Sequence, residues 1–212
     1  MIVIFDLDQT LVDTLHRFHV CFNELLGQYG LRELKWEEFV EAYSADELNK
    51  YIPSHVDVEE FWRKFRRMHC SRRHPEDRLY EGVHDVLKYL KERGFRIVVT
   101  TGRECTEEEL WDELRAFGID KYVDYACSLA QIKEEEFLWS KKGMIEHVMR
   151  KFSASPEEII FIADYWTDMR SAKELGVRRI AVLTGLEPKE RLLLNGAEEI
   201  IEGVWELPKV IR

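Results

Sequence analysis

Two aspartates near the start of the chain, Asp6 and Asp8, constrain the fold more than any other feature. They follow residues 2–5, a continuous Ile/Val/Phe run that is typical of a strand buried on both faces of a parallel sheet. Parallel sheets bind ligands at the carboxyl ends of their strands, and alternate residues of extended backbone point to one side. The pair therefore indicates a functional site, although Asp is also common in ordinary turns after strands.

The composition limits the class of protein. A chain of 212 residues with 45% hydrophobic residues is long enough for one well-packed domain, or for one domain with an insertion. The formal net charge of −10 argues against general nucleic-acid binding. No apolar stretch reaches the roughly 18 residues of a membrane span, and no leader pattern is visible. We therefore expect a cytoplasmic protein that binds neither membrane nor nucleic acid; its oligomeric state stays open.

The spacing of apolar runs predicts an α/β fold. Strands are expected at residues 2–5, 95–100, 122–127, 159–163 and 179–183, and helices at 81–93, 106–117, 142–152 and 167–175. Strands that alternate with helices form βαβ units, which build a parallel sheet with helices on both faces. The sequence thus predicts a Rossmann-like core of three layers.

Residues 15–79 interrupt this alternation. They carry helical patterns at 18–29, 36–43 and 58–70, many aromatic residues, and no convincing strand. We interpret them as an inserted helical domain with a small core of its own, flanked by a core domain of residues 1–14 and 80–212. The two junctions, residues 12–15 and 80–82, are candidate hinges.

Polar residues also follow the later strands. Asp164 and Asp168 come after the fourth strand, four positions apart, which places them on one side of a helical turn. Acidic residues are favoured at helix N-termini in any case, so this pair alone is ambiguous. The second strand ends in Thr-Thr-Gly-Arg at 100–103, where a hydroxyl, a small residue and a cation would suit a phosphate. Two lysines, Lys141 and Lys142, begin the helix before the fourth strand.

Taken together, these groups predict a metal site. The carboxyl ends of parallel strands share one edge, so the four aspartates are expected to gather there. Carboxylates at low dielectric repel one another strongly unless a cation lies between them. Oxygen ligands favour Mg²⁺, which commonly bridges carboxylates and a substrate phosphate.

The order of these motifs resembles the haloacid dehalogenase superfamily, whose members are mostly phosphatases. Residues 5–13, Phe-Asp-Leu-Asp-Gln-Thr-Leu-Val-Asp, are similar to the family's first motif, with Gln9 where Gly is most frequent. Residues 94–101 match the stretch that leads to its second motif, and Ala163-Asp164 stands for the usual Gly-Asp of the fourth. An insertion between the first and second motifs resembles the helical cap called C1.

The resemblance implies roles for these residues. Asp6 would be the nucleophile that forms an aspartyl-phosphate, and Asp8 would be the general acid and base. The phosphate would be bound by Thr101 (or Thr100), Gly102 and Lys142, with Lys141 as the alternative lysine. Mg²⁺ would be held by Asp6, Asp164 and the backbone carbonyl of Asp8, with Asp168 completing or orienting this set.

These roles predict a Mg²⁺-dependent phosphatase that hydrolyses a small phosphorylated metabolite. In this family a second Asp at position 8 favours phosphomonoester hydrolysis or a mutase over dehalogenation. A phosphomutase or phosphotransferase on the same fold stays possible, as does a non-catalytic binding domain of the same fold. The basic cluster at 63–67 and 72–73 is either a solvated helix face or a contact for an anionic substrate. The four scattered cysteines are expected to be inert thiols, because none forms a C-x-x-C pair.

Overall fold

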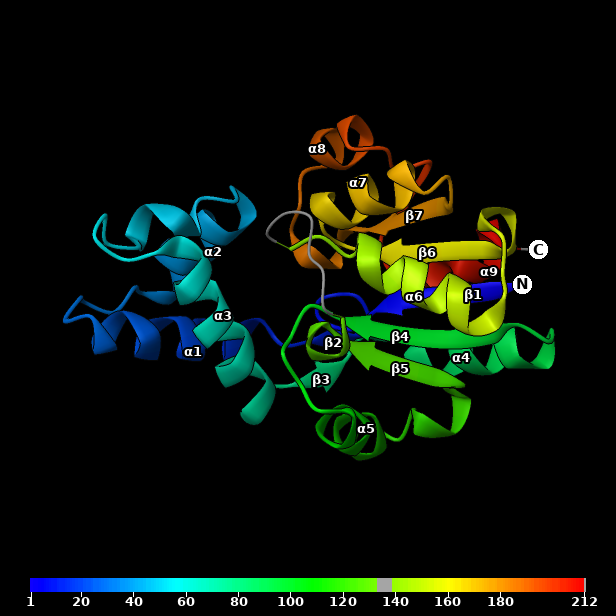
Figure 1. The fold of residues 1–212 in the computed structure, drawn as a ribbon, viewed down its shortest axis with the longest axis horizontal. Helices are drawn as coiled ribbons and strands as arrows, with labels where there is room; N and C mark the ends of the chain where they lie inside the picture. The colour runs from blue at the N-terminus through cyan, green and yellow to red at the C-terminus, as the bar shows by residue number, and fades with distance from the viewer. Residues whose placement is uncertain (133–138, 212) are drawn as a thin grey trace.

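A computed structural model describes residues 1–132 and 139–211 of the chain. Within these residues, six parallel strands form one sheet in the order β5-β4-β1-β6-β7-β8 (Figure 1). The strands are β1 (Ile2–Asp6), β4 (Arg96–Thr101), β5 (Tyr125–Ser128), β6 (Ile159–Ala163), β7 (Arg178–Val182) and β8 (Glu199–Ile201). The predicted α/β class is confirmed. The strand expected at 122–127 begins later, because residues Asp120–Tyr122 form a 3₁₀ turn, and β8 was not predicted as a strand.

Helices cover both faces of the sheet and complete the three layers. The alternation along β1 divides the core, because Val3 and Phe5 pack into one hydrophobic cluster and Ile2 and Ile4 into another. The first cluster includes residues of α4 (Val83–Glu92), α5 (Glu107–Ala116) and α9 (Leu207–Val210); the second includes residues of α6 (Lys142–Phe152), α7 (Trp166–Glu174) and α8 (Lys189–Leu194). Among the helices of the described residues, none is both long enough and apolar enough to span a membrane.

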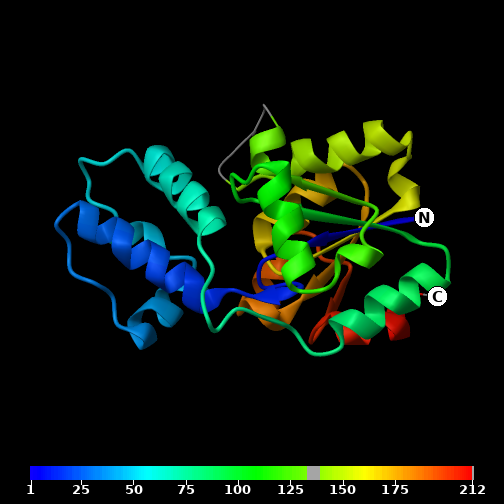
Figure 2. The ribbon, with the colours of Figure 1, turned by 90° about the horizontal axis from the view of Figure 1, so that it is seen from below.

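The insertion lies beside the carboxyl edge of the sheet and is joined to the core by two chain crossings (Figure 2). It contains α1 (Leu15–Gln28), α2 (Trp36–Ser44), a 3₁₀ turn (Leu48–Tyr51) and α3 (Val58–Ser71). These elements bury a third hydrophobic cluster that includes Phe22, Phe39 and Phe61, as expected from the aromatic content. The two crossings pair with each other, because β2 (Val12–Asp13) runs antiparallel to β3 (Arg78–Leu79).

Two of the four cysteines are not inert thiols. A disulfide joins Cys70, near the end of α3, to Cys105, which precedes α5. It therefore connects the insertion to the core. Cys21 and Cys127 are free and buried. Sequence spacing could not reveal the pair, since 35 positions separate two residues that meet only in the folded chain.

Candidate active site

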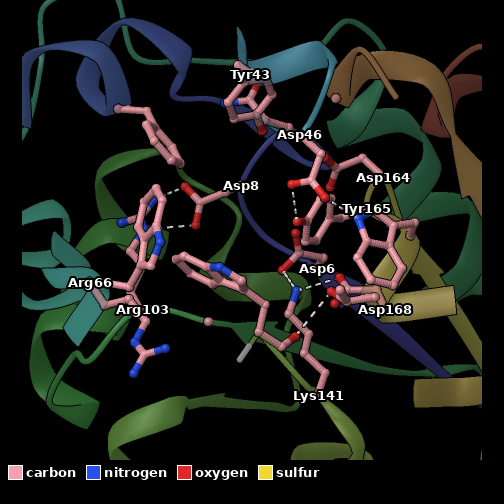
Figure 3. Close-up of a pocket in the computed structure, with 18 of the residues that line it drawn as sticks. Asp6, Asp8, Tyr43, Asp46, Arg66, Arg103, Lys141, Asp164, Tyr165 and Asp168 are labelled. Carbon is pink, nitrogen blue, oxygen red and sulfur yellow. Dashed lines mark hydrogen bonds and ion pairs between the residues drawn. The ribbon is translucent and has the colours of Figure 1, made fainter. Parts of the chain in front are cut away.

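A cavity of about 300 Å³ lies between the carboxyl edge of the sheet and the insertion. From the core it is lined by Asp6, Asp8, Gly102, Arg103, Lys141, Asp164 and Asp168, among others. From the insertion it is lined by residues of α1 and α3, and by Tyr43, Asp46, Leu48 and Asn49. Residues from three strand ends thus meet at one place, as the motifs predicted (Figure 3).

Lys141 lies between two of the carboxylates. Its Nζ donates to Asp168 Oδ2 at 2.7 Å and also contacts Asp6 Oδ1 (Figure 3). All three side chains are buried. Burial lowers the pKa of Lys141, but Asp168 and Asp6 raise it above its ordinary value, so the ammonium stays charged.

This placement corrects the expected choice of lysine. Lys142 was expected in the site, but its Nζ forms an ion pair with Glu174 Oε2 on α7 at 3.4 Å, and Lys142 does not line the cavity. Lys141, the alternative, lies one residue before α6 begins and points into the cavity. Adjacent residues at a helix start point in different directions, so sequence alone could not separate the two.

Asp164 lies directly after β6 and is fixed by two contacts. Thr10 Oγ1 donates to Asp164 Oδ1 at 2.9 Å. Gly185 approaches the carboxylate so closely that a Cβ at this position would lie 1.9 Å from Asp164 Oδ2. Only glycine fits beside the carboxylate, which is therefore held in one orientation.

The acidic cluster has the chemistry of a site for a hard cation. Burial raises the pKa of Asp6 to about 7, with Asp168 and Asp8 adding to the shift. Burial likewise raises the pKa of Asp164, well above its ordinary range, and of Asp168. One lysine faces three buried carboxylates, so a further positive charge would stabilise their ionised forms. In the described residues no group of three or more His, Cys, Asp or Glu is already arranged for a metal, but the all-oxygen donors suit Mg²⁺.

Asp8 has a different environment from Asp6. Arg103 donates from Nε to Asp8 Oδ2 at 2.8 Å and from Nη2 to Oδ1. Thr14 and Thr101 donate to the same carboxylate from their hydroxyls, at 2.6 and 3.1 Å. Burial raises the pKa of Asp8, but Arg103 outweighs it and lowers the pKa below its ordinary value. Asp8 is thus held as a carboxylate, whereas burial favours the protonated form of Asp6.

Arg103 also belongs to a buried ion-pair chain that the sequence did not indicate. Its Nη1 donates to Glu113 Oε2 on α5 at 2.5 Å, and Arg17 of α1 donates to Glu113 Oε1 at 2.9 Å. Arg17 further donates to Asp77 at 2.5 Å. The arginine that was expected to suit a phosphate is therefore engaged with Asp8 and Glu113. This series of ion pairs links the site to the insertion. It could not be predicted from the sequence, because its members lie in three distant segments.

The remaining predicted residues have distinct positions. Thr101 ends β4 and bonds Asp8, whereas the Thr100 hydroxyl donates to the Phe5 carbonyl at 3.2 Å, within the sheet. Gly102 lines the cavity. Gln9 adopts a left-handed φ of 57°, the conformation that glycine favours, and its amide lies 2.8 Å from the Tyr80 hydroxyl.

The insertion contacts the core beside the site through hydrogen bonds that were not predicted from the sequence. Tyr165 and Trp166, which directly follow Asp164, donate from Oη and Nε1 to the Asp46 carboxylate at 2.7 and 2.9 Å (Figure 3). Arg191 donates to the Ala45 carbonyl at 3.1 Å. Within the basic cluster, Arg66 is the residue that lines the cavity.

Comparisons with known proteins identify a matching family and related folds. A family model described as haloacid dehalogenase-like hydrolase matches residues 3–182. A pyrophosphatase, PpaX, from Halalkalibacterium halodurans is 27% identical over 188 residues, covering 85% of this chain and 82% of the relative.

Solved structures share the fold over nearly the whole chain. A haloacid dehalogenase-like family hydrolase from Streptococcus pneumoniae has a TM-score of 0.79 at 20% identity, covering 99% of this chain and 97% of the other. A predicted phosphoglycolate phosphatase from Haemophilus somnus has a TM-score of 0.78 at 22% identity, covering 100% and 97%. At these identities the likeness concerns the fold.

Proposed function

Because the chain belongs to the haloacid dehalogenase-like hydrolase family, we propose that it is a Mg²⁺-dependent phosphatase that hydrolyses a small phosphomonoester. One observation carries the proposal. Asp6, Asp164 and Asp168 are buried together at the carboxyl edge of the sheet, and Lys141 bridges two of them. With a divalent cation bound, a cluster of this kind would neutralise and orient a transferring phosphoryl group.

Asp6 is the proposed nucleophile. A carboxylate oxygen of Asp6 attacks phosphorus and the bond to the leaving oxygen breaks. Asp8 first takes up a proton from solvent as the substrate displaces one of its contacts with Arg103, and then gives this proton to the leaving oxygen. Water then attacks the phosphorus of the aspartyl-phosphate, Asp8 accepts its proton, and the bond to Asp6 breaks. Lys141 and Thr101 would hold the phosphoryl oxygens, with Gly102 leaving room for them.

The proposed metal position follows from the donor set. Asp6, Asp164 and the backbone carbonyl of Asp8 would hold Mg²⁺, and Asp168 would orient Lys141 and the ion. When bound, Mg²⁺ supplies positive charge to the carboxylates and the phosphoryl oxygens. Thr10 and Gly185 fix Asp164 for this role.

Phosphate release from an activated aryl phosphate tests the proposal. The purified protein is stripped with a chelator, assayed, and assayed again after Mg²⁺ is restored, with Asp6→Asn as the blank for contaminating phosphatases. We expect turnover only with Mg²⁺, and inhibition by Ca²⁺, which prefers looser, higher coordination. Full activity after stripping contradicts the metal assignment, and no activity above the blank contradicts the phosphatase.

Inorganic pyrophosphate is a second candidate substrate. It is favoured by the printed name of the Halalkalibacterium halodurans relative, which shares 27% identity with this chain. The same assay with pyrophosphate in place of the aryl phosphate tests it. The wall of the cavity that the insertion contributes bears directly on this choice.

A further inference from the structure

Aromatic rings form much of the cavity wall that the insertion contributes. Phe18 of α1 and Trp62 and Phe65 of α3 line it, together with Trp139. The ring centroids of Phe18 and Phe65 lie 4.3 Å apart, and Trp62 lies 5.2 Å from both Phe65 and Trp139. These rings pack into the insertion's hydrophobic cluster, so they form a fixed apolar surface opposite the phosphate-binding groups.

The charges on this wall do not form a second anion site. Among the described lining residues of the insertion, the charged side chains are Asp46 and Arg66, because burial lowers the pKa of His69 and keeps its ring neutral. Arg66 Nε lies 3.2 Å from Glu104 Oε1, and its guanidinium faces the Trp139 ring at 5.4 Å. The core adds the carboxyl of Glu187 to the same cavity. A second phosphate would therefore meet a wall whose positive charge is already balanced.

His69 is the polar exception on the aromatic surface. Its side chain is almost fully buried, and its ring is stacked on Phe65 at 5.3 Å. Within the described parts of the chain, its Nε2 has no hydrogen-bond partner, although His69 lines the cavity. The nitrogen itself has almost no exposed surface, so a ligand in the cavity meets the stacked ring and does not reach this atom.

We propose that the leaving group of the substrate is a compact, uncharged organic group with a planar ring. The ring packs against Phe18, Trp62 and Phe65. This assignment deepens the proposed phosphatase function and rests on it. It makes pyrophosphate, whose leaving group is a second phosphate, a poor substrate.

Matched substrates test the assignment. Benzyl phosphate and ethyl phosphate both release a poorly acidic alcohol, so they need the same acid catalysis and differ mainly in the ring. We expect kcat/KM for benzyl phosphate to exceed that for ethyl phosphate by at least about tenfold, because one apolar carbon in a fitted pocket is worth roughly 10–200-fold. Pyrophosphate should be turned over more slowly than benzyl phosphate.

Two variants of similar size locate the contact. Phe65→Leu removes a ring from the cavity wall and should lower the benzyl-to-ethyl ratio by about tenfold. Phe61→Leu is the control, because Phe61 is buried in the same cluster but does not line the cavity, so the ratio should be unchanged.

A binding measurement tests the ring subsite independently of the proposed phosphatase activity. Benzylphosphonate cannot be hydrolysed at its P–C bond, and its affinity is measured by calorimetry for the wild type, Phe65→Leu and Phe61→Leu. Weaker binding to Phe65→Leu alone supports the subsite even if the protein releases no phosphate. A benzyl-to-ethyl ratio near one, equal effects of the two Phe variants, or a preference for pyrophosphate overturns it while leaving a working phosphatase.

Discussion

Arg103 and Asp8 form a two-point ion pair, with Arg103 Nε 2.8 Å from Asp8 Oδ2 and Nη2 in contact with Oδ1. Thr14 and Thr101 donate to the same carboxylate. Both oxygens of Asp8 therefore have protein partners before any ligand binds. To act as acid and base, Asp8 must exchange one of these contacts for the substrate or water, so its role depends on the geometry of the pair.

Asp6 and Asp8 should fail differently when they are mutated. Asp6→Asn removes the nucleophile, so activity should vanish and no phosphoenzyme should form. Asp8→Asn keeps the nucleophile but loses proton transfers that are typically worth about 10²–10⁴-fold. An activated aryl phosphate needs little acid help in the first step, but water attack still needs the base. Asp8→Asn should therefore accumulate aspartyl-phosphate, seen by mass spectrometry of the intact protein as added phosphate.

Thermal melts provide the control, because asparagine cannot accept all the donors that surround Asp8 and could disturb the fold. Near-normal turnover by a folded Asp6→Asn variant would show that the nucleophile is another residue.

The adjacent lysines offer a matched pair of variants. Lys141→Met removes the cation between Asp6 and Asp168 and should lower kcat/KM by roughly 10²–10³-fold, as the loss of a single group that stabilises the transition state does elsewhere. Lys142→Met removes an ion pair with Glu174 outside the cavity and should change kcat/KM little. The two are compared with one aryl phosphate at saturating Mg²⁺. Equal losses would mean that the site extends to Lys142.

Ionisation of Glu113 should make the free energy of unfolding depend on pH. Burial raises its pKa, but Arg103 and Arg17 outweigh this and lower the pKa below its ordinary value of 4.5. The ionised carboxylate therefore stabilises the fold above about pH 4.5, and this contribution is lost as pH falls through the lowered pKa. Glu113→Gln removes one carboxylate partner from each of two buried arginines, which keep Asp8 and Asp77, and should cost about 1.5–3 kcal/mol at pH 7.

Urea unfolding at pH 7 and at pH 3.5 measures the effect. The cost of Glu113→Gln should shrink at the lower pH, because the wild-type carboxyl is then closer to protonation. Glu108→Gln, an exposed change on the same helix, is the control. A cost that stays the same at both values of pH would contradict the assigned ionisation.

The sequence predicted the core and its acidic edge because both depend on local patterns. Apolar runs predicted β1, β4 and β6, and the residues after each run were expected at one edge of a parallel sheet. Asp6, Asp8, Asp164 and Asp168 could be named for that reason. The short strand β8 was missed, since three residues carry too little pattern to distinguish a strand from a turn.

The parts that sequence reasoning missed depend on where side chains point and on contacts between distant segments. Lys141 and Lys142 are equivalent in sequence, and only the start of α6 decides which faces Asp6. The series of ion pairs from Arg17 through Glu113 to Arg103 joins side chains from three separate segments. The spacing of apolar residues cannot predict such contacts, because each partner is an ordinary charged residue of its own helix or loop.

The disulfide between Cys70 and Cys105 should stabilise the folded chain. It closes a loop of 35 positions between the insertion and the core, and the loss of chain entropy for such a loop corresponds to about 4 kcal/mol. The double variant Cys70→Ser/Cys105→Ser should lose about that free energy of unfolding relative to the oxidised wild type. Because β3 and the second crossing lie within this loop, hydrogen exchange at residues 72–82 should also become faster in the variant.

Thiol titration under denaturing conditions identifies the pair directly. The oxidised wild type should show two thiols, from Cys21 and Cys127, and four after reduction. Reductant should lower the stability of the wild type and leave that of the double variant unchanged, since the remaining cysteines are not bonded to each other. Four thiols in protein that was never reduced would show that the bond does not form in solution, and the insertion would then be joined to the core by the two chain crossings and by contacts such as those of Asp46, Arg67 and Arg17.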